Sequence, residues 1–198
     1  HKEYRRQRQM CIRDRYSDTF KIIFVGSVTD RKNPKIIIES LETIDGDVSL
    51  EIIGQTPNLK YLKELNNLIS SSKYSERITM TPFIEAEQLI SKYASANLFI
   101  LPSKSEGLGR VIIEAQATAC PVLVSSNTGM VDLIIENETG YIFENNNKND
   151  LSNKIQYIMN NYESALQTGL NSKNFIKENQ SVANFEFGYK KLIDLVSI

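Results

Sequence analysis

From Phe20 onward, short runs of apolar, β-branched residues alternate with longer segments of helical periodicity. This alternation constrains the fold more than any other feature, because it is typical of βαβ units that build a parallel sheet. Most of the runs are apolar throughout, as expected for strands that are covered on both faces. We therefore predict an α/β fold with a Rossmann-like parallel sheet and helices on both of its faces.

The sequence divides into predicted strands with helices between them, and it ends in helices. The predicted strands are Phe20–Val25, 49–53, 78–80, Leu98–Leu101, 122–124 and Tyr141–Phe143. Helices are predicted between the strands at 34–43, 59–70, 87–94, Arg110–Ala117 and 130–135, and after them at 149–160, 163–178 and 183–196. At 198 residues, without a Pro-, Gly- or Ser-rich linker, the chain is expected to form one domain.

Residues 1–15 differ from the rest of the chain in composition. They are rich in arginine and follow neither a helical nor a strand period, and a basic arm that binds nucleic acid is one interpretation. Residues 9–15, however, resemble the in-frame translation of a transposase adapter used in sequencing libraries. We therefore interpret 1–15 as a non-native, disordered segment and 16–198 as the domain. Without the six basic and two acidic residues of 1–15, 17 basic and 22 acidic residues remain. The resulting net charge of −5 indicates no nucleic-acid partner.

The residue types that are scarce in this chain exclude several kinds of site. His1 is the only histidine, so neither a histidine base nor a histidine-ligated metal centre is expected. Cys11 and Cys120 lack the number and spacing of a disulfide framework or a zinc site, which favours a reducing, cytoplasmic setting. Asp45-Gly46-Asp47 has the D-x-D pattern of a metal site, but it precedes a strand, and we interpret it as a turn. The apolar runs are far shorter than the roughly 20 residues of a membrane span.

The segment after the strand Leu98–Leu101 is the most informative one for function. In open α/β sheets, ligands bind at the carboxyl ends of strands, where this segment lies. Gly107 and Gly109 allow the backbone to approach a ligand, and the amides at the start of the next helix favour an anion such as a diphosphate. Glu106 and Glu114 bracket this place, and carboxylates accept hydrogen bonds from sugar or ribose hydroxyls. The alternative is that Glu106 caps the helix and Glu114 is solvated on its surface.

The spacing of these two glutamates also carries a family resemblance. Glu106, seven intervening residues and Glu114, set between 101–103 and 115–122, resemble the E-x(7)-E signature of retaining glycosyltransferases of the GT-B fold, the glycosyl transferases group 1 or family 4 type. The likeness runs from about Phe20 to the C-terminus. It corresponds to the C-terminal, donor-binding domain of that family without the N-terminal acceptor domain. It implies metal-independent transfer from a nucleoside-diphosphate sugar, which is a substrate, and it implies no cofactor.

An earlier segment resembles the loop after the first strand of that family. In the family, an arginine and a lysine of this loop clamp the donor diphosphate. In the segment that begins at Gly26, Lys32 matches the lysine, whereas Ser27 stands at the arginine position. Arg31 therefore becomes the candidate for the second positive charge.

The resemblance assigns roles to residues at the matching positions. Phe83 follows a segment that resembles the strand whose loop meets the nucleobase, although Pro82 replaces the usual glycine and removes a possible amide donor. Glu106 and Lys32 are the expected catalytic residues, through the donor sugar and its departing diphosphate. The donor-binding set is Gly26, Ser27, Arg31, Lys32, Phe83, Glu106, Gly107, Leu108, Gly109, Arg110 and Glu114, and no metal ligand is expected.

The resemblance implies a hexosyltransferase of polysaccharide or glycolipid biosynthesis. The missing N-terminal domain holds the glycan or lipid acceptor, so this chain alone is expected to bind the donor without efficient transfer. The expected location is the cytoplasm, with peripheral association at the inner face of the membrane, and the Ile-, Asn- and Lys-rich composition is typical of bacteria. Two alternatives stay open: a nucleotide-sugar epimerase of the same fold, and a non-catalytic nucleotide-sugar-binding module, which Ser27 favours.

Overall fold

The computed structural model describes residues 19–179, which form the predicted Rossmann-like α/β fold. One six-stranded sheet has the order β3-β2-β1-β4-β5-β6, and all neighbouring strands are parallel. The strands are β1 (Phe20–Val25), β2 (Val48–Ile53), β3 (Ile78–Thr81), β4 (Leu98–Leu101), β5 (Val122–Ser125) and β6 (Tyr141–Phe143). The predicted segment 1–15 and the predicted helix 183–196 lie outside the described residues.

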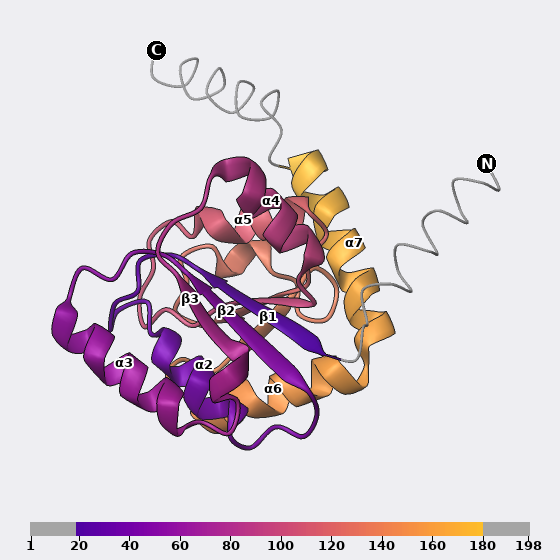
Figure 1. Ribbon diagram of the computed structural model, residues 1–198. Coiled ribbons are helices and arrows are strands. Elements are labelled where there is room, and N and C mark those ends of the chain that lie inside the picture. The colour runs from indigo at the N-terminus through magenta and orange to yellow at the C-terminus, as the bar shows by residue number, and fades with distance from the viewer. Residues whose placement is uncertain (1–18, 180–198) are drawn as a thin grey trace, which may run out of the picture.

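Helices lie on both sides of the sheet (Figure 1). They are α2 (Pro34–Leu41), α3 (Leu59–Ser71), α4 (Ala86–Ser95), α5 (Arg110–Ala117), α6 (Lys148–Asn160) and α7 (Tyr162–Asn179), with short 3₁₀ turns η1 (Ser75–Arg77) and η2 (Val131–Leu133). On one side α2 contacts α3 and α6, and on the other side α5 contacts α4 and α7. Between residues 19 and 179, no helix combines the length and apolar character needed to cross a membrane.

The predicted helix at 130–135 is wrong, because only the 3₁₀ turn η2 forms there. The amide of Ile134 donates to the carbonyl of Val131 at 2.8 Å, which is the i→i+3 bond of a 3₁₀ turn. The amide of Ile135 then donates to Oγ1 of Thr139 at 2.8 Å. The threonine side chain thus takes the donor that an α-helix would need to continue.

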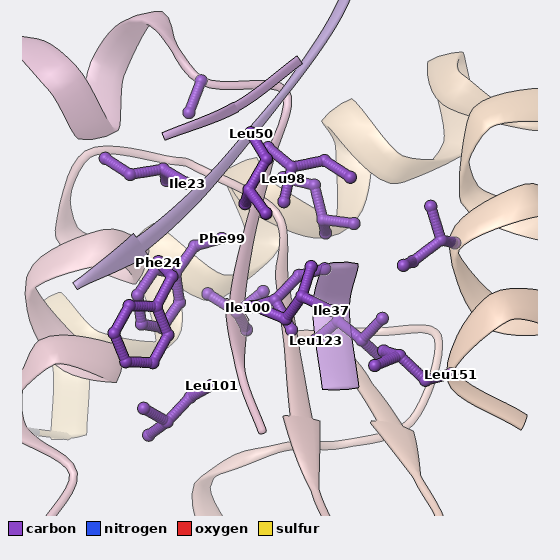
Figure 2. Packing of buried hydrophobic residues seen from close by; sticks show 14 of the residues in the cluster. Ile23, Phe24, Ile37, Leu50, Leu98, Phe99, Ile100, Leu101, Leu123 and Leu151 are labelled. Atoms are coloured by element: carbon purple, nitrogen blue, oxygen red, sulfur yellow. The ribbon is translucent and has the colours of Figure 1, made fainter. Parts of the chain in front are cut away.

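The hydrophobic core is centred on the middle strands of the sheet. All four residues of β4 are fully buried, as predicted for a strand covered on both faces. Phe24 of β1, Ile37 of α2 and Leu151 of α6 belong to the same buried cluster as these residues (Figure 2). Burial of one such side chain stabilises the fold by about 1.5–3 kcal/mol. The strands therefore form a rigid base for the loops at their carboxyl ends.

The order of the strands reverses between β1 and β4. From β1 the chain adds β2 and β3 on one side, and it then crosses over to place β4 on the other side of β1. The loops that follow β1 and β4 leave the sheet at this switch point, and ligands of open α/β sheets bind there. The segments that hold Lys32 and Glu106 are these two loops.

Candidate functional site

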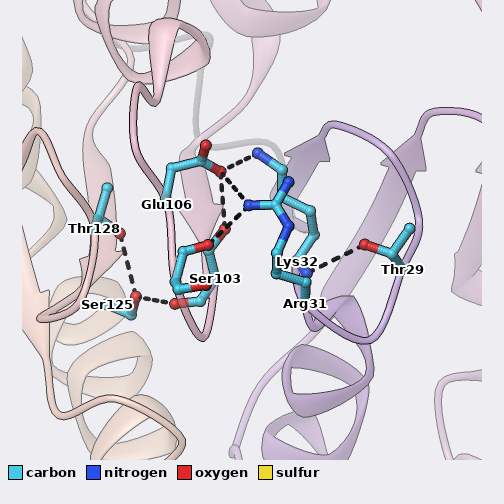
Figure 3. A network of polar contacts seen from close by, with 8 residues as sticks. Thr29, Arg31, Lys32, Ser103, Glu106, Ser125 and Thr128 are labelled. Carbon is cyan, nitrogen blue, oxygen red and sulfur yellow. Dashed lines mark hydrogen bonds and ion pairs between the residues drawn. The ribbon is translucent and has the colours of Figure 1, made fainter.

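The loops after β1 and β4 bring Lys32 and Glu106 into contact (Figure 3). The ammonium of Lys32 pairs with Oε2 of Glu106, and Nη1 of Arg31 lies 3.9 Å from the same oxygen. The side chains of Lys32 and Glu106 are only 13% and 8% exposed, whereas that of Arg31 is 56% exposed. The two residues to which the family resemblance assigns catalytic roles therefore form a largely buried ion pair at the switch point.

A local turn directs Lys32 toward the β4 loop. Asn33, the N-cap of α2, has a left-handed backbone with φ 52°, a conformation that asparagine adopts more readily than most residues. The amide of Asn33 donates to the carbonyl of Thr29 at 2.9 Å, and the amide of Lys32 donates to Oγ1 of Thr29 at 3.3 Å. The turn is short and closed by these two bonds, so the position of Lys32 is fixed by the backbone.

The two loops are also bonded to each other. Nη1 of Arg31 donates to the carbonyl of Ser105 at 2.9 Å, and the amide of Lys104 donates to the carbonyl of Arg31 at 2.8 Å. The ammonium of Lys104 pairs with Asp30 at 2.7 Å. The predicted residue Arg31 thus connects the β1 loop to the β4 loop and remains mostly open to solvent.

The first predicted residue, Gly26, has a role that the sequence does not reveal. It follows β1 directly with φ +148°, and its amide donates to the carbonyl of Ile53 at 2.9 Å. A Cβ on Gly54, after β2, would overlap the carbonyl of Gly26, so the two loops meet backbone to backbone. Ser27, the residue in the family's arginine position, is exposed beside this contact.

The carboxyl end of β5 and the loop after it support Glu106, the loop through the backbone of Glu106 and Ser125 indirectly through Ser103. The amide of Gly129 donates to the carbonyl of Glu106 at 2.6 Å. Oγ of Ser125 donates to the carbonyl of Ser103 at 2.5 Å, and Oγ of Ser103 donates to Oε2 of Glu106 at 3.4 Å. Both serines are fully buried. The sequence predictions omit them, although Ser125 ends an apolar strand and Ser103 comes two residues after one, which was the available signal.

The N-terminus of α5 is free of a side-chain cap. Its N-cap is Gly109, and no side chain bonds to the first amides of the helix. The alternative in which Glu106 caps this helix is therefore wrong, because its carboxylate turns toward Lys32 instead. Gly107 has nothing within 4 Å of the position where a Cβ would lie, so open space adjoins the backbone here. Helix-start amides with this access favour an anion.

Glu114 lies on the exposed surface of α5, and its carboxylate has a buried partner. The hydroxyl of Tyr93, in α4, donates to Oε2 of Glu114 at 3.2 Å. Tyr93 is only 1% exposed. Burial raises the pKa of the Tyr93 hydroxyl, and the negative charge of Glu114 raises it further. The interpretation of Glu114 as a merely solvated carboxylate is therefore incomplete.

The other predicted residues lie around this centre at different distances along the sheet. Leu108 and Arg110 belong to the β4 loop and the start of α5, and both are exposed. Phe83 follows β3, two strands away from β1, and is 66% exposed. The structure thus gathers Lys32, Arg31 and Glu106, while Phe83 stands apart from them.

A hollow of about 450 Å³ lies elsewhere, against the first halves of β1 and β2 beside α4. Two of the basic side chains that line it are paired with acids: Lys92 with Glu51 at 2.8 Å, and Arg77 with Asp47. Asp47 belongs to the D-x-D pattern, and it also accepts a hydrogen bond from Oγ1 of Thr19 at 2.8 Å. Over residues 19–179, His, Cys, Asp and Glu form no cluster of three that could hold a metal ion.

Comparison with known proteins identifies the family of this chain. The family model described as glycosyl transferases group 1 matches residues 6–175. An uncharacterized glycosyltransferase of Methanocaldococcus jannaschii is 30% identical over 158 residues, which cover 79% of this chain and 43% of that protein. The capsular polysaccharide biosynthesis glycosyltransferase CapM of Staphylococcus aureus is 32% identical over 151 residues, 73% of this chain and 38% of CapM.

Among solved structures, Anabaena HepE in complex with UDP and glucose has a TM-score of 0.81 at 20% identity. The match covers 98% of this chain and 51% of that one. This likeness shows the fold. The chain therefore spans about half or less of each of these proteins.

Proposed function

The chain belongs to the glycosyl transferases group 1 family, and on that premise we propose that it is the donor-binding part of a glycosyltransferase. The donor is a nucleoside-diphosphate sugar, and the sugar passes to a glycan or lipid acceptor. One observation carries the proposal: Lys32 and Glu106 meet at the switch point, and the loop of Glu106 leads to the uncapped N-terminus of α5. A cation, a carboxylate and helix-start amides together suit a diphosphate that carries a sugar.

The diphosphate binds between Lys32 and the first turn of α5. Lysine acts on phosphate as a point charge, and the helix amides and dipole add directed donors. The open space at Gly107 supports this position, because a ligand can approach the backbone there. Arg31 supplies the second positive charge from its exposed position, which compensates for Ser27 and weighs against a module without catalysis.

Donor binding exchanges the partners of Lys32 and Glu106. In the ligand-free protein, the two side chains neutralise each other in a place that is largely closed to water. An incoming diphosphate carries more negative charge than a carboxylate and competes for Lys32. Glu106 then becomes available to accept hydrogen bonds from the sugar hydroxyls, while Ser103 keeps its carboxylate in place. The ion pair is thus the resting state of the donor site.

The transfer step relies on charge stabilisation. The bond between the anomeric carbon and the diphosphate oxygen breaks, and a bond to the acceptor hydroxyl oxygen forms on the same face with retention of configuration. The acceptor proton moves to an oxygen of the departing diphosphate. Lys32 and the α5 amides stabilise the charge that develops on this leaving group, and such preorganised groups account for about 10²- to 10³-fold in rate each. The transfer requires no metal ion.

A second domain, of the kind that holds the acceptor, covers the carboxyl edge of the sheet in the whole protein. This chain accounts for 43% and 38% of the length of the two relatives described above. Three large apolar side chains, Leu59, Phe83 and Leu108, are exposed in the segments after β2, β3 and β4. Apolar side chains along one edge are typical of a surface that another domain covers. The whole enzyme acts in polysaccharide or glycolipid synthesis, and the relative CapM is named for capsular polysaccharide biosynthesis.

The test is calorimetric titration of the chain with nucleoside diphosphates and the corresponding nucleotide sugars. The chain is expected to bind at least one nucleoside diphosphate, and HepE, whose structure holds UDP and glucose, makes UDP the first choice. Lys32→Ala is expected to weaken this binding by about 1.5–3 kcal/mol, as for a hydrogen bond to a charged group. Binding of the nucleoside without phosphate should change much less.

The matched control is Lys35→Ala. Lys35 lies one turn further along the chain in α2, where it pairs with Glu39 at 3.8 Å. The control variant should bind the diphosphate like the unmodified protein. Absence of binding to every nucleoside diphosphate, or equal loss in both variants, would overturn the proposed function.

A further inference from the structure

A buried tyrosine hydroxyl reaches an exposed carboxylate of the candidate site. Tyr93 lies in α4, its ring is 1% exposed, and it packs edge-on against Phe99 of β4 with the ring centroids 5.6 Å apart. Its hydroxyl donates to Oε2 of Glu114 at 3.2 Å. Glu114 itself points from the exposed face of α5. A rigid group in the core therefore fixes one oxygen of a side chain at the surface.

This arrangement has a chemical consequence for Glu114. An exposed glutamate without a partner samples several rotamers, and ordering it on ligand binding costs conformational entropy. A carboxylate offers about four acceptor positions, and the single proton of Tyr93 occupies one of them. The remaining positions stay open to a ligand, on a carboxylate that is already oriented. The rotamer cost is thus met by folding and not by binding.

We propose that Tyr93 is a positioning residue that holds the carboxylate of Glu114 ready for the ribose hydroxyls of a nucleoside diphosphate. This inference rests on the proposed function, in which Glu114 binds the ribose of the donor. Burial raises the pKa of the Tyr93 hydroxyl, so it remains a proton donor throughout the neutral range. A hydrogen bond that only ties α4 to α5 would instead affect stability without affecting which ligand binds.

The test removes the hydroxyl and leaves the ring. Tyr93→Phe keeps the contact with Phe99, and calorimetry then compares a nucleoside diphosphate, its 2′-deoxy form and inorganic pyrophosphate. The variant is expected to bind the nucleoside diphosphate roughly two- to tenfold more weakly, the range of one net hydrogen bond. Its affinity for pyrophosphate should be unchanged. Combined with Glu114→Gln, the Tyr93 substitution should cause no further loss.

The matched control is Tyr141→Phe. Tyr141 lies in β6, at the edge of the sheet and two strands away from β4. It is also buried, at 2% exposure, and its hydroxyl lies 3.3 Å from Oγ1 of Thr168 in α7. This variant loses a buried hydroxyl as Tyr93→Phe does, and it should bind all three ligands normally. A second test variant, Glu114→Asp, draws the carboxylate back from Tyr93 and should reduce the preference for ribose over 2′-deoxyribose.

The outcomes separate this inference from the proposed function. If the unmodified protein binds no nucleoside diphosphate, the proposed function fails. If it binds and Glu114→Gln weakens binding, but Tyr93→Phe does not, the inference alone is overturned. Equal losses for nucleoside diphosphate and pyrophosphate, or an undiminished ribose preference in Glu114→Asp, would also overturn it.

Discussion

Two ion pairs in this molecule consist of the same residue types, a lysine and a glutamate, and differ in their surroundings. Lys32 and Glu106 meet between loops at the carboxyl edge, with side chains 13% and 8% exposed, and Arg31 and Ser103 reach the same carboxylate oxygen. Lys92 and Glu51 meet over the sheet face at the hollow, with side chains 43% and 24% exposed. The first pair is held by three loops in a place that favours an anion. The second balances charge at a solvated surface.

The difference teaches that position in the fold, and not residue type, makes an ion pair a candidate site. The carboxyl edge at a switch point collects loop ends and helix-start amides, whereas the first halves of the strands offer mainly side chains. Lys92 and Arg77 at the hollow already pair with acids, so an added anion gains little from these two cations. At the carboxyl edge, an added anion also gains the helix amides.

The sharpest way to break this comparison is to remove each lysine in the whole transferase. Lys32→Ala is expected to lower kcat by about 10²- to 10³-fold, because charge on the leaving diphosphate is no longer compensated. Lys92→Ala should change kcat less than about twofold, as for an exposed ion pair. Steady-state kinetics with saturating donor measures both. A comparable loss of kcat in the two variants would contradict a specific role of the carboxyl edge in transfer.

The glycines of the carboxyl edge give the next largest effect. A Cβ on Gly129 would overlap the carbonyl of Gly107, whereas a Cβ on Gly107 meets open space. Gly129→Ala should therefore lower the free energy of unfolding by about 1–3 kcal/mol, the usual cost of overpacking. Gly107→Ala should leave stability within about 0.5 kcal/mol and weaken nucleotide binding instead. Denaturant unfolding and calorimetry on both variants check this; the reverse assignment would refute the geometry.

The sequence predicted the fold well because its signal is local. The bounds of β1, β4 and β6 are as predicted, since apolar runs flanked by turns define them. The helix at 130–135 failed because Thr139, a residue beyond it, takes an amide by a side-chain bond. A bond of that kind has no periodic signature in the sequence.

The candidate site was predictable only in its parts. Spacing and family resemblance pointed to Lys32, Glu106 and Glu114, but 74 residues separate Lys32 from Glu106, and no local pattern predicts their contact. The support from Ser103 and Ser125 depends on which strands become neighbours. The contact of the Tyr93 hydroxyl with Glu114 was not predictable either, because an aromatic residue in a helix normally indicates core packing alone.

Two buried tyrosines make the stability of the protein depend on pH in the alkaline range. Burial raises the pKa of Tyr61, in α3, to about 12, with a further contribution from Asp30 in the β1 loop. Burial also raises the pKa of Tyr74, the N-cap residue of η1. A tyrosine of raised pKa keeps its proton in the folded state above pH 10, where the unfolded chain loses it, so the free energy of unfolding falls as pH rises.

Phenylalanine variants should separate these two contributions. The free energy of unfolding falls between pH 10 and pH 12, and Tyr61→Phe is expected to make this fall smaller by about 1–2 kcal/mol, after allowance for solvent screening. Tyr74→Phe should reduce the same fall by a smaller amount. Unfolding in denaturant at several values between pH 8 and pH 12 gives the slopes. Identical slopes in the unmodified protein and Tyr61→Phe would contradict the assigned cause.

The smallest expected effect, and the most direct test of the comparison, is the salt dependence of the two ion pairs. A double-mutant cycle on Lys92 and Glu51 should give a coupling of about 0.2–1 kcal/mol. This coupling should shrink as salt rises, because the screening length falls from about 10 Å at 0.1 M to about 3 Å at 1 M. The Lys32–Glu106 coupling should change less, since both side chains are shielded from the solvent ions. Each cycle is measured by denaturant unfolding at the two salt concentrations, with alanine at each position. If both couplings fall in the same proportion, the two pairs share one environment, and burial does not set the carboxyl edge apart from the hollow.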